Sequence, residues 1–217
     1  DVAQLLRDML SAGLDNAGEP FVLHSEAADR LEYLQRPDLG RRLDAPSREQ
    51  LKALPPSRGE GWDIAIVIAD GLSSLAVAQN AVPFLVALQR LLAGDVRVAP
   101  PVIVGQGRVA IGDEIGELLG AKLVLLLIGE RPGLSSPDSM GAYLTWAPRV
   151  GLTDASRNCI SNIRPAGLPW DKAAAKVHYL LAQMQARQLS GVGLKDETVA
   201  VAVEKGSQHG NFLLEQS

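Results

Sequence analysis

Two uninterrupted apolar runs constrain the fold of this chain more than any other feature of its sequence. One run covers residues 64–69 and is rich in β-branched side chains, and the other covers residues 123–128. Short runs that are apolar at every position are typical of strands covered on both faces in a parallel sheet. The sequence before residue 61 is polar by comparison, so we expect the main hydrophobic core to begin near this point.

Helical patterns alternate with these runs along the chain. Ser73 or Ser74 can cap the first expected helix, and Pro83 should kink it. Alternation of strand and helix indicates right-handed crossovers between parallel strands. The sequence therefore predicts an α/β fold with a doubly wound, mainly parallel, Rossmann-like sheet. The expected helices cover residues 73–92, 109–119 and 173–188, and the further expected strands cover residues 96–104, interrupted by a proline pair, and 142–146.

The chain divides into three expected parts: a small helical and loop-rich N-terminal region (1–60), a sheet domain (61–196) and a tail (197–217). Within the first part, residues 1–10 have the pattern of an amphipathic helix. Ser47, with Gln50 three residues later, has the pattern of a helix entry. The tail loses all periodicity, so we expect it to be disordered or non-native. The first residue is not Met, which suggests a trimmed start, and no signal peptide is recognisable there.

Composition excludes several classes of protein. With 217 residues, 47% of them hydrophobic, the chain can bury one sizeable core. A net charge of −4 gives no electrostatic reason to expect nucleic acid or an anionic membrane as partner. The single cysteine, Cys159, excludes an internal disulfide and fits a reducing compartment. No apolar run approaches the roughly 20 residues that span a bilayer, so we expect a soluble intracellular protein.

Three loops are the expected place for a ligand, because open α/β sheets bind ligands beyond the carboxyl ends of their strands. These loops cover residues 70–74, 105–109 and 129–137. The second contains Gly105 and Gly107 and resembles a dinucleotide fingerprint, but the next glycine comes five residues later instead of three. Glycines still let a backbone approach a ligand, and Val109 would offer an apolar surface beside them. A simple strand-to-helix turn is an equal alternative.

Glu130 and Cys159 are further candidates. Glu130 ends the second apolar run, where its carboxylate either accepts hydrogen bonds from a ligand, pairs with Arg131 or caps a helix. Cys159 lies among Asn, Ser and Arg residues in what we expect to be a polar loop, a common place for a binding site. A lone cysteine is usually a small core residue, and no histidine is near it in the sequence, so we assign it no catalytic role. The sequence holds no metal-ligand cluster.

Seven segments of the chain resemble the small (light) subunit family of ethanolamine ammonia-lyase. They occur in the order of the family and extend over about residues 20–196, nearly the whole predicted folded part. The tail after Asp196 departs from the family. The segments are residues 36–43, 62–74, 108–116, 129–134, 143–149, 158–165 and 190–196.

The resemblance implies a partnership. In the family, a large subunit with a TIM barrel binds ethanolamine, and a radical from adenosylcobalamin begins its conversion to acetaldehyde and ammonia. The small subunit closes over the cobalamin held between the two chains. The cofactor contacts of the family on this subunit match Val109, Glu130 and Cys159. The resemblance implies no catalytic residue here, and it leaves open housing in a bacterial microcompartment.

The histidines bear on how the cobalt would be ligated. Many cobalamin proteins supply a histidine from the motif Asp-x-His-x-x-Gly, but the residues two before the histidines here are Val22, Lys176 and Ser207. The resemblance thus implies that cobalt keeps its dimethylbenzimidazole ligand. Two other classes stay open: a stand-alone nucleotide-binding α/β enzyme, and a purely structural subunit that does not touch the cofactor.

Overall fold

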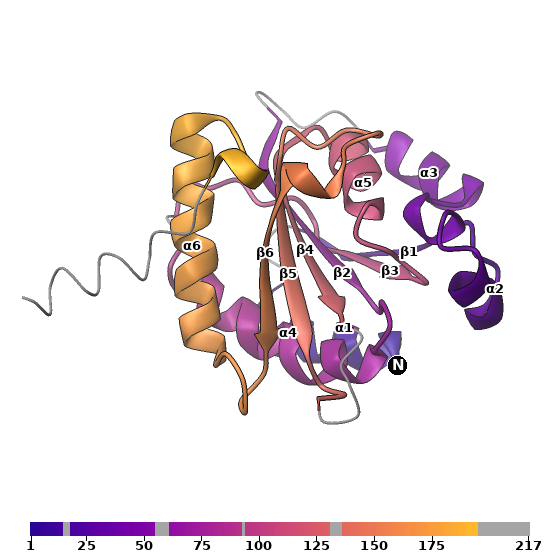
Figure 1. Ribbon diagram of the computed structural model, residues 1–217, viewed down its shortest axis with the longest axis horizontal. Coiled ribbons are helices and arrows are strands. Elements are labelled where there is room, and N and C mark those ends of the chain that lie inside the picture. The colour runs from indigo at the N-terminus through magenta and orange to yellow at the C-terminus, as the bar shows by residue number, and fades with distance from the viewer. Residues whose placement is uncertain (15–17, 55–60, 93, 131–135, 195–217) are drawn as a thin grey trace, which may run out of the picture.

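A computed structural model describes residues 1–14, 18–54, 61–92, 94–130 and 136–194 of the chain. These residues form one six-stranded sheet with helices packed on it (Figure 1). The order across the sheet is β1-β3-β2-β4-β5-β6. The strands are β1 (Phe21–His24), β2 (Trp62–Ala69), β3 (Val102–Gly105), β4 (Ala121–Gly129), β5 (Met140–Trp146) and β6 (Arg157–Ile163).

The two apolar runs form the neighbouring strands β2 and β4 in the interior of the sheet. They pair in parallel over most of their length, and both are buried, as the sequence predicted. The strands β1, β3, β2 and β4 are parallel, whereas β5 runs antiparallel to both of its neighbours, β4 and the border strand β6. The sheet is therefore mixed. Its assignment as a doubly wound, Rossmann-like fold stays a prediction.

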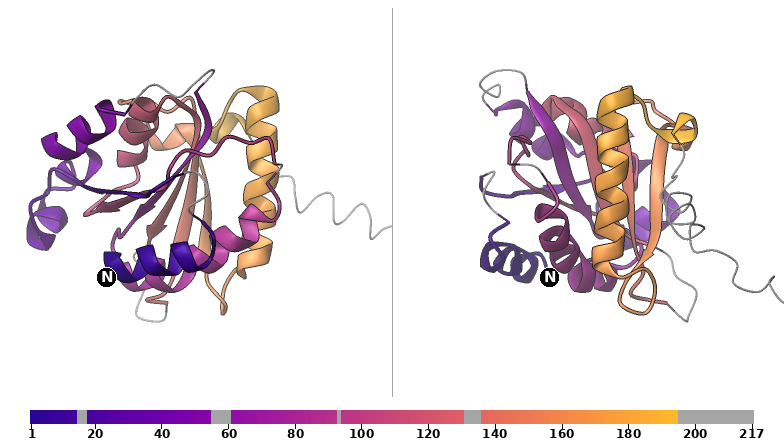
Figure 2. Two further views of the ribbon diagram at one scale, coloured as in Figure 1. Left: turned by 180° about the vertical axis from the view of Figure 1, so that it is seen from behind. Right: turned by 90° about the vertical axis from the view of Figure 1, so that its left-hand side faces the viewer.

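Helices lie on both faces of the sheet (Figure 2). Because successive strand residues point to opposite faces, Ile66 and Ile68 pack in the same core cluster as α1, α4 and α6, while Val67 packs in the other cluster with α3 and α5. None of the helices within the described ranges is long and apolar enough to cross a membrane. The helices are α1 (Val2–Ser11), α2 (Arg30–Gln35), α3 (Ala45–Lys52), α4 (Ser74–Gln89), α5 (Ile111–Leu119) and α6 (Trp170–Arg187).

The helix starts show one confirmed and one wrong prediction. Ser73 caps α4, since its side chain accepts a hydrogen bond from the Ala76 amide at 3.2 Å. The cap of α3 is Asp44 and not Ser47, because the carboxylate of Asp44 accepts the Ser47 amide at 2.8 Å. The Ser47 hydroxyl accepts from the His24 amide at 2.9 Å and so ties α3 to β1.

Two strands were not predicted. β1 lies within the region expected to be helical and loop-rich, and it pairs with β3. β6 contains Cys159, so the expectation of a polar loop at this residue was wrong. β6 borders the sheet, and its exposed positions carry polar side chains that look loop-like in the sequence. Conversely, residues 96–99 form only an isolated bridge, through Val98 to Ile64, and no strand.

Two other expectations fall outside the described part of the chain. The tail, predicted from residue 197, belongs to the undescribed range 195–217, and Arg131, considered as a partner of Glu130, belongs to the range 131–135. The remaining elements match their predicted ranges closely. α4 ends at Gln89, before the predicted Leu92, and α6 ends at Arg187.

Candidate functional site

The three loops singled out by the sequence meet at the carboxyl edge of β2, β3 and β4. The Leu72 amide donates to the Gly129 carbonyl at 2.9 Å, and the Gly107 amide donates to Oδ1 of Asp70 at 3.3 Å. Gly129 lies against backbone: a Cβ atom there would be 2.0 Å from the Ser73 carbonyl oxygen. Only glycine permits this approach. The described parts of the three loops, which leave out residues 131–135, form one cluster.

The loop between β3 and α5 is fixed from several sides. Beside the Asp70 contact, the buried Tyr33 of α2 donates its hydroxyl to the Gly107 carbonyl at 3.3 Å. The Arg108 amide donates to the Gly40 carbonyl at 2.7 Å. These bonds come from widely separated parts of the sequence. They set the position of Val109, which follows directly in the chain.

A cavity of about 320 Å³, here named the edge cavity, opens at this edge. Val109 and Glu130, predicted separately from the sequence, both line it. The structure therefore brings together two of the three predicted site residues. The lining residues are Tyr33, Leu72, Arg108, Val109, Ile128, Gly129, Glu130 and Tyr143.

The Glu130 carboxylate is held by one of its two oxygens. Ser139 Oγ donates to Oε2 at 2.8 Å, and the Asn162 amide donates to the same oxygen at 3.3 Å. Asn162 lies at an irregularity in the pairing of β5 and β6, with a φ of 60°, which turns its amide toward the carboxylate. Within the described residues, Oε1 accepts no hydrogen bond. The side chain also lies over Gly141, where a Cβ would be 2.6 Å from Oε1.

Cys159 lies beside the edge cavity and does not line it. It is exposed on β6, opposite Tyr143 of β5, and its Sγ is 3.3 Å from Ser161 Oγ. Burial raises the pKa of Tyr143 above its ordinary value, and the neighbouring Cys159 adds to this shift. Desolvation of the sulfur also raises the pKa of the Cys159 thiol, despite the contact to Ser161. The thiol is thus held protonated, unlike the thiolate that a nucleophilic cysteine needs.

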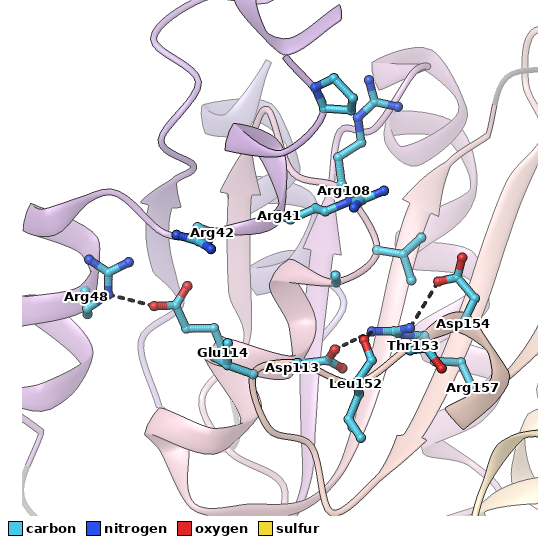
Figure 3. A pocket seen from close by; sticks show the side chains of 15 residues that line it. Arg41, Arg42, Arg48, Arg108, Asp113, Glu114, Leu152, Thr153, Asp154 and Arg157 are labelled. Atoms are coloured by element: carbon cyan, nitrogen blue, oxygen red, sulfur yellow. Dashed lines mark hydrogen bonds and ion pairs between the residues drawn. The ribbon is translucent and has the colours of Figure 1, made fainter.

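A second, larger cavity of about 780 Å³ lies between α5, the segment that follows α2 and residues 150–157 (Figure 3). We name it the basic cavity. Arg108 and Val109 line both cavities, so the two adjoin. Five arginines line the basic cavity: Arg41, Arg42, Arg48, Arg108 and Arg157.

Two of these arginines are paired with carboxylates of α5. Arg157 forms an ion pair with Asp113 in which both side chains are buried, and Arg48 Nε lies 2.6 Å from Oε1 of Glu114 (Figure 3). Burial raises the pKa of Asp113 to about 6, and the attraction of Arg157 only partly offsets this. These pairs join α5 to β6 and α3 and neutralise part of the cavity wall.

Three of the polar residues that line the edge cavity were not named as candidates from the sequence: Tyr33, Arg108 and Tyr143. Arg108 and Tyr143 fall in segments that resemble the family, and Arg108 directly precedes Val109, so a signal was present for both. Tyr33 has no such signal. Its position depends on the packing of α2, which is six residues long, against a loop more than 70 residues away.

Comparison with known proteins shows the family. The family described as ethanolamine ammonia-lyase light chain (EutC) matches residues 2–195. Three relatives, each named ethanolamine ammonia-lyase small subunit, are similar over nearly all of this chain. They come from Pseudomonas putida (53% identical, covering 96% of this chain and 82% of the relative), Pseudomonas aeruginosa (56%, 94% and 76%) and Azotobacter vinelandii (55%, 94% and 77%). With a match of this extent and identity, the chain belongs to the ethanolamine ammonia-lyase light-chain family.

Proposed function

We propose that this chain is the small subunit of adenosylcobalamin-dependent ethanolamine ammonia-lyase and holds the cobalamin against a catalytic large subunit. The complex would convert ethanolamine to acetaldehyde and ammonia, in the cytoplasm or within a bacterial microcompartment. Membership of the family and the names of the relatives support the subunit role. The observation that carries the cofactor role is that Val109 and Glu130 line one cavity at the carboxyl edge of the sheet.

The edge cavity suits part of a cobalamin and not the whole. Its volume of about 320 Å³ cannot enclose a corrin, so a second protein surface has to cover the rest of the ring. A corrin is wide and carries amide groups around its rim. Val109 and Leu72 offer apolar contact to the ring, while Glu130 offers an acceptor to an amide N–H. When bound, the cofactor supplies radical chemistry, and the protein supplies binding and orientation.

The Glu130 side chain is preorganised for this role. Its Oε2 is held by Ser139 and Asn162, so the side chain need not be ordered on binding. Its Oε1 remains as an acceptor. Cys159 lies one strand further out, past Tyr143, and would meet the part of the cofactor that extends beyond the edge cavity.

Replacing Glu130 tests the proposal directly. Glu130→Gln keeps the shape of the side chain and one acceptor for Ser139 and Asn162, but puts an NH₂ group at the position of Oε1. A hydrogen bond to a charged group contributes about 1.5–3 kcal/mol, so we expect cobalamin affinity to fall about ten- to a hundredfold. The measurement is a spectroscopic titration of cobalamin into the assembled two-subunit complex.

The matched control is Glu49→Gln, which removes the same charge from an exposed position on α3. It should leave cobalamin affinity unchanged. Assembly with the large subunit, followed by size-exclusion chromatography, should be normal for both variants. Equal cobalamin affinity in Glu130→Gln and the unmodified complex would remove Glu130 from the site.

A bulky residue at position 109 distinguishes a cofactor-binding subunit from a purely structural one. Val109 is only partly buried and lines both cavities, so a Val109→Trp side chain would fill the space where they adjoin. We expect weaker cobalamin binding with assembly preserved. A structural subunit would instead retain full cobalamin affinity in this variant.

Titration of the isolated chain separates the proposal from a stand-alone nucleotide-binding enzyme. We expect cobalamin binding to need the large subunit, because the edge cavity encloses too little of the ring. Tight binding of NAD(P) by the chain alone would favour the nucleotide-binding alternative.

A further inference from the structure

Three arginines of the basic cavity have no carboxylate within ion-pair distance among the residues that the structure describes. They are Arg41 and Arg42, which follow α2, and Arg108, which precedes α5. The other two arginines of the cavity are neutralised by Asp113 and Glu114. A third carboxylate of the lining, Asp154, lies 3.1 Å from Arg157 Nη1. The part of the wall formed by Arg41, Arg42 and Arg108 is therefore positive, although the whole chain carries a net charge of −4.

The Arg108 side chain is held in place by contacts that use only one of its three nitrogens as a donor. Its Nη2 donates to the Tyr33 carbonyl at 2.9 Å, and its guanidinium lies 4.1 Å from the centroid of the Tyr33 ring. Gly40 lies against its stem, where a Cβ would be 2.8 Å from Arg108 Cγ. Among the described residues, its buried Nε has no acceptor and its Nη1 donates no hydrogen bond. A ligand cannot reach the buried Nε, whereas Nη1 is not covered by protein and is the donor that a ligand in the cavity would contact.

We infer that the basic cavity is a binding site for a phosphate group, held by Arg41, Arg42 and Arg108. Guanidinium groups bind phosphate oxygens through pairs of parallel hydrogen bonds. A tetrahedral phosphate can accept from several directions at once, which suits three arginines that line one cavity, whereas a planar carboxylate is satisfied by one or two. Val109 and Ala110, which directly precede α5, also line the cavity, but Asp113 and Glu114 in the first turn offset the positive end of this helix dipole.

Two sources can supply the phosphate group. One is a free phosphate or a small phosphorylated metabolite, which a cavity of about 780 Å³ has room to hold. The other is the phosphodiester in the nucleotide tail of cobalamin, which would enter from the adjoining edge cavity past Arg108 and Val109. The second source rests on the proposed function, and the first does not.

The test uses the double variant Arg41→Gln/Arg42→Gln in the assembled complex. Both side chains are exposed, so the variant should fold, and unfolding midpoints check this. The matched control, Arg7→Gln/Arg187→Gln, also removes two exposed positive charges, but from α1 and α6 on the opposite face of the sheet. The probes are inorganic phosphate, cobalamin and cobinamide, which lacks the nucleotide tail and its phosphodiester.

We expect the double variant to bind either inorganic phosphate or cobalamin at least about tenfold more weakly, the loss of one charge-assisted contact. Loss toward phosphate alone identifies a free anion, and loss toward cobalamin with cobinamide unchanged identifies the nucleotide tail. The control should match the unmodified complex throughout.

Three results would overturn the inference: unchanged affinity for both phosphate and cobalamin, an equal loss for cobalamin and cobinamide, or failure of the double variant to assemble. The last would show that the arginines face an acidic surface of the large subunit. If the unmodified complex binds no cobalamin, the proposed function fails by itself, and the phosphate titration still decides this inference.

Discussion

The two ends of the central strands β2 and β4 differ in whether their charged side chains find all their hydrogen-bond partners within the protein. At the amino end, Asp63 accepts hydrogen bonds from the Arg97 amide at 2.9 Å and from Lys122 Nζ at 3.0 Å. At the carboxyl end, Glu130 leaves one oxygen without a donor, and Arg108 leaves a buried N–H without an acceptor, within the described residues. A polar cluster that satisfies itself stabilises the fold. A polar cluster with unpaired donors and acceptors can instead form hydrogen bonds with a ligand.

The pKa of Asp63 shows how its cluster with Arg97 and Lys122, here named the closed cluster, stabilises the fold. Burial alone would raise it, but hydrogen bonds from Arg97 and Lys122 outweigh burial and lower it to about 2. Because the folded pKa lies below the ordinary value of 3.8, ionised Asp63 stabilises the fold above that value. This stability is lost as the pH falls toward 2. At the carboxyl end, the unpaired atoms of Glu130 and Arg108 add no comparable stability to the fold.

The largest effect on stability is expected from Gly129→Ala, which breaks the backbone contact that builds the carboxyl end. The new Cβ would lie 2.0 Å from the Ser73 carbonyl oxygen and 2.7 Å from that of Asp70, and neither backbone can move without shifting a loop. We expect the free energy of unfolding in urea to fall by about 3 kcal/mol. The control is Gly94→Ala, since a Cβ at residue 94 would meet nothing within 4 Å. Equal stability of the two variants would show that the loops are not in close contact.

The sequence was sufficient for the parts of the fold in which burial decides the pattern. β2 and β4 are apolar at almost every position because both faces are covered. The end of β4 led to Glu130, and the glycine loop after β3 led to Val109. The sequence was insufficient where a pattern was short or split. β1 has four residues, and β6 is mostly polar without a regular alternation and is interrupted by an irregularity, so neither stands out.

The prediction of the α3 cap was wrong, and the prediction of the edge cavity was incomplete, for a different reason. Asp44 and Ser47 are both good capping residues, and the choice was made by His24, whose amide binds Ser47 Oγ. Likewise, Tyr33 reaches the cavity only because α2 packs on a distant loop. Such contacts join residues far apart in the sequence, and no local pattern encodes them.

An intermediate effect is expected from Asp63→Asn, which opens the closed cluster at the amino end. The lowering of the Asp63 pKa from 3.8 to about 2 corresponds to about 2 kcal/mol of stability at pH 7. The variant should therefore be less stable by that amount at pH 7, and the difference should disappear as the pH falls toward 2. Unfolding in urea at several pH values measures this.

The same variant sharpens the comparison of the two ends. Among the described residues the Asp63 carboxylate pairs with Arg97 and Lys122, at the strand end opposite the edge cavity, so Asp63→Asn should leave cobalamin affinity of the assembled complex unchanged. Asp171→Asn, an exposed substitution on α6, is the control and should alter neither property. A loss of stability that does not depend on pH would contradict the role given to the ionised carboxylate.

The smallest effect is expected from Cys159→Ser, and it marks where the carboxyl-end site stops. The side chain is exposed, contacts Ser161 and lies outside the edge cavity, so stability should change by less than about 0.5 kcal/mol. Serine keeps the size and the hydrogen-bonding capacity of the residue, so we expect cobalamin affinity to fall far less than in Glu130→Gln. If instead the two variants lose equal affinity, the cofactor rests on β6 as firmly as on the edge cavity. The open, ligand-binding end of the molecule would then include the antiparallel strands, and the parallel strands would supply only half of it.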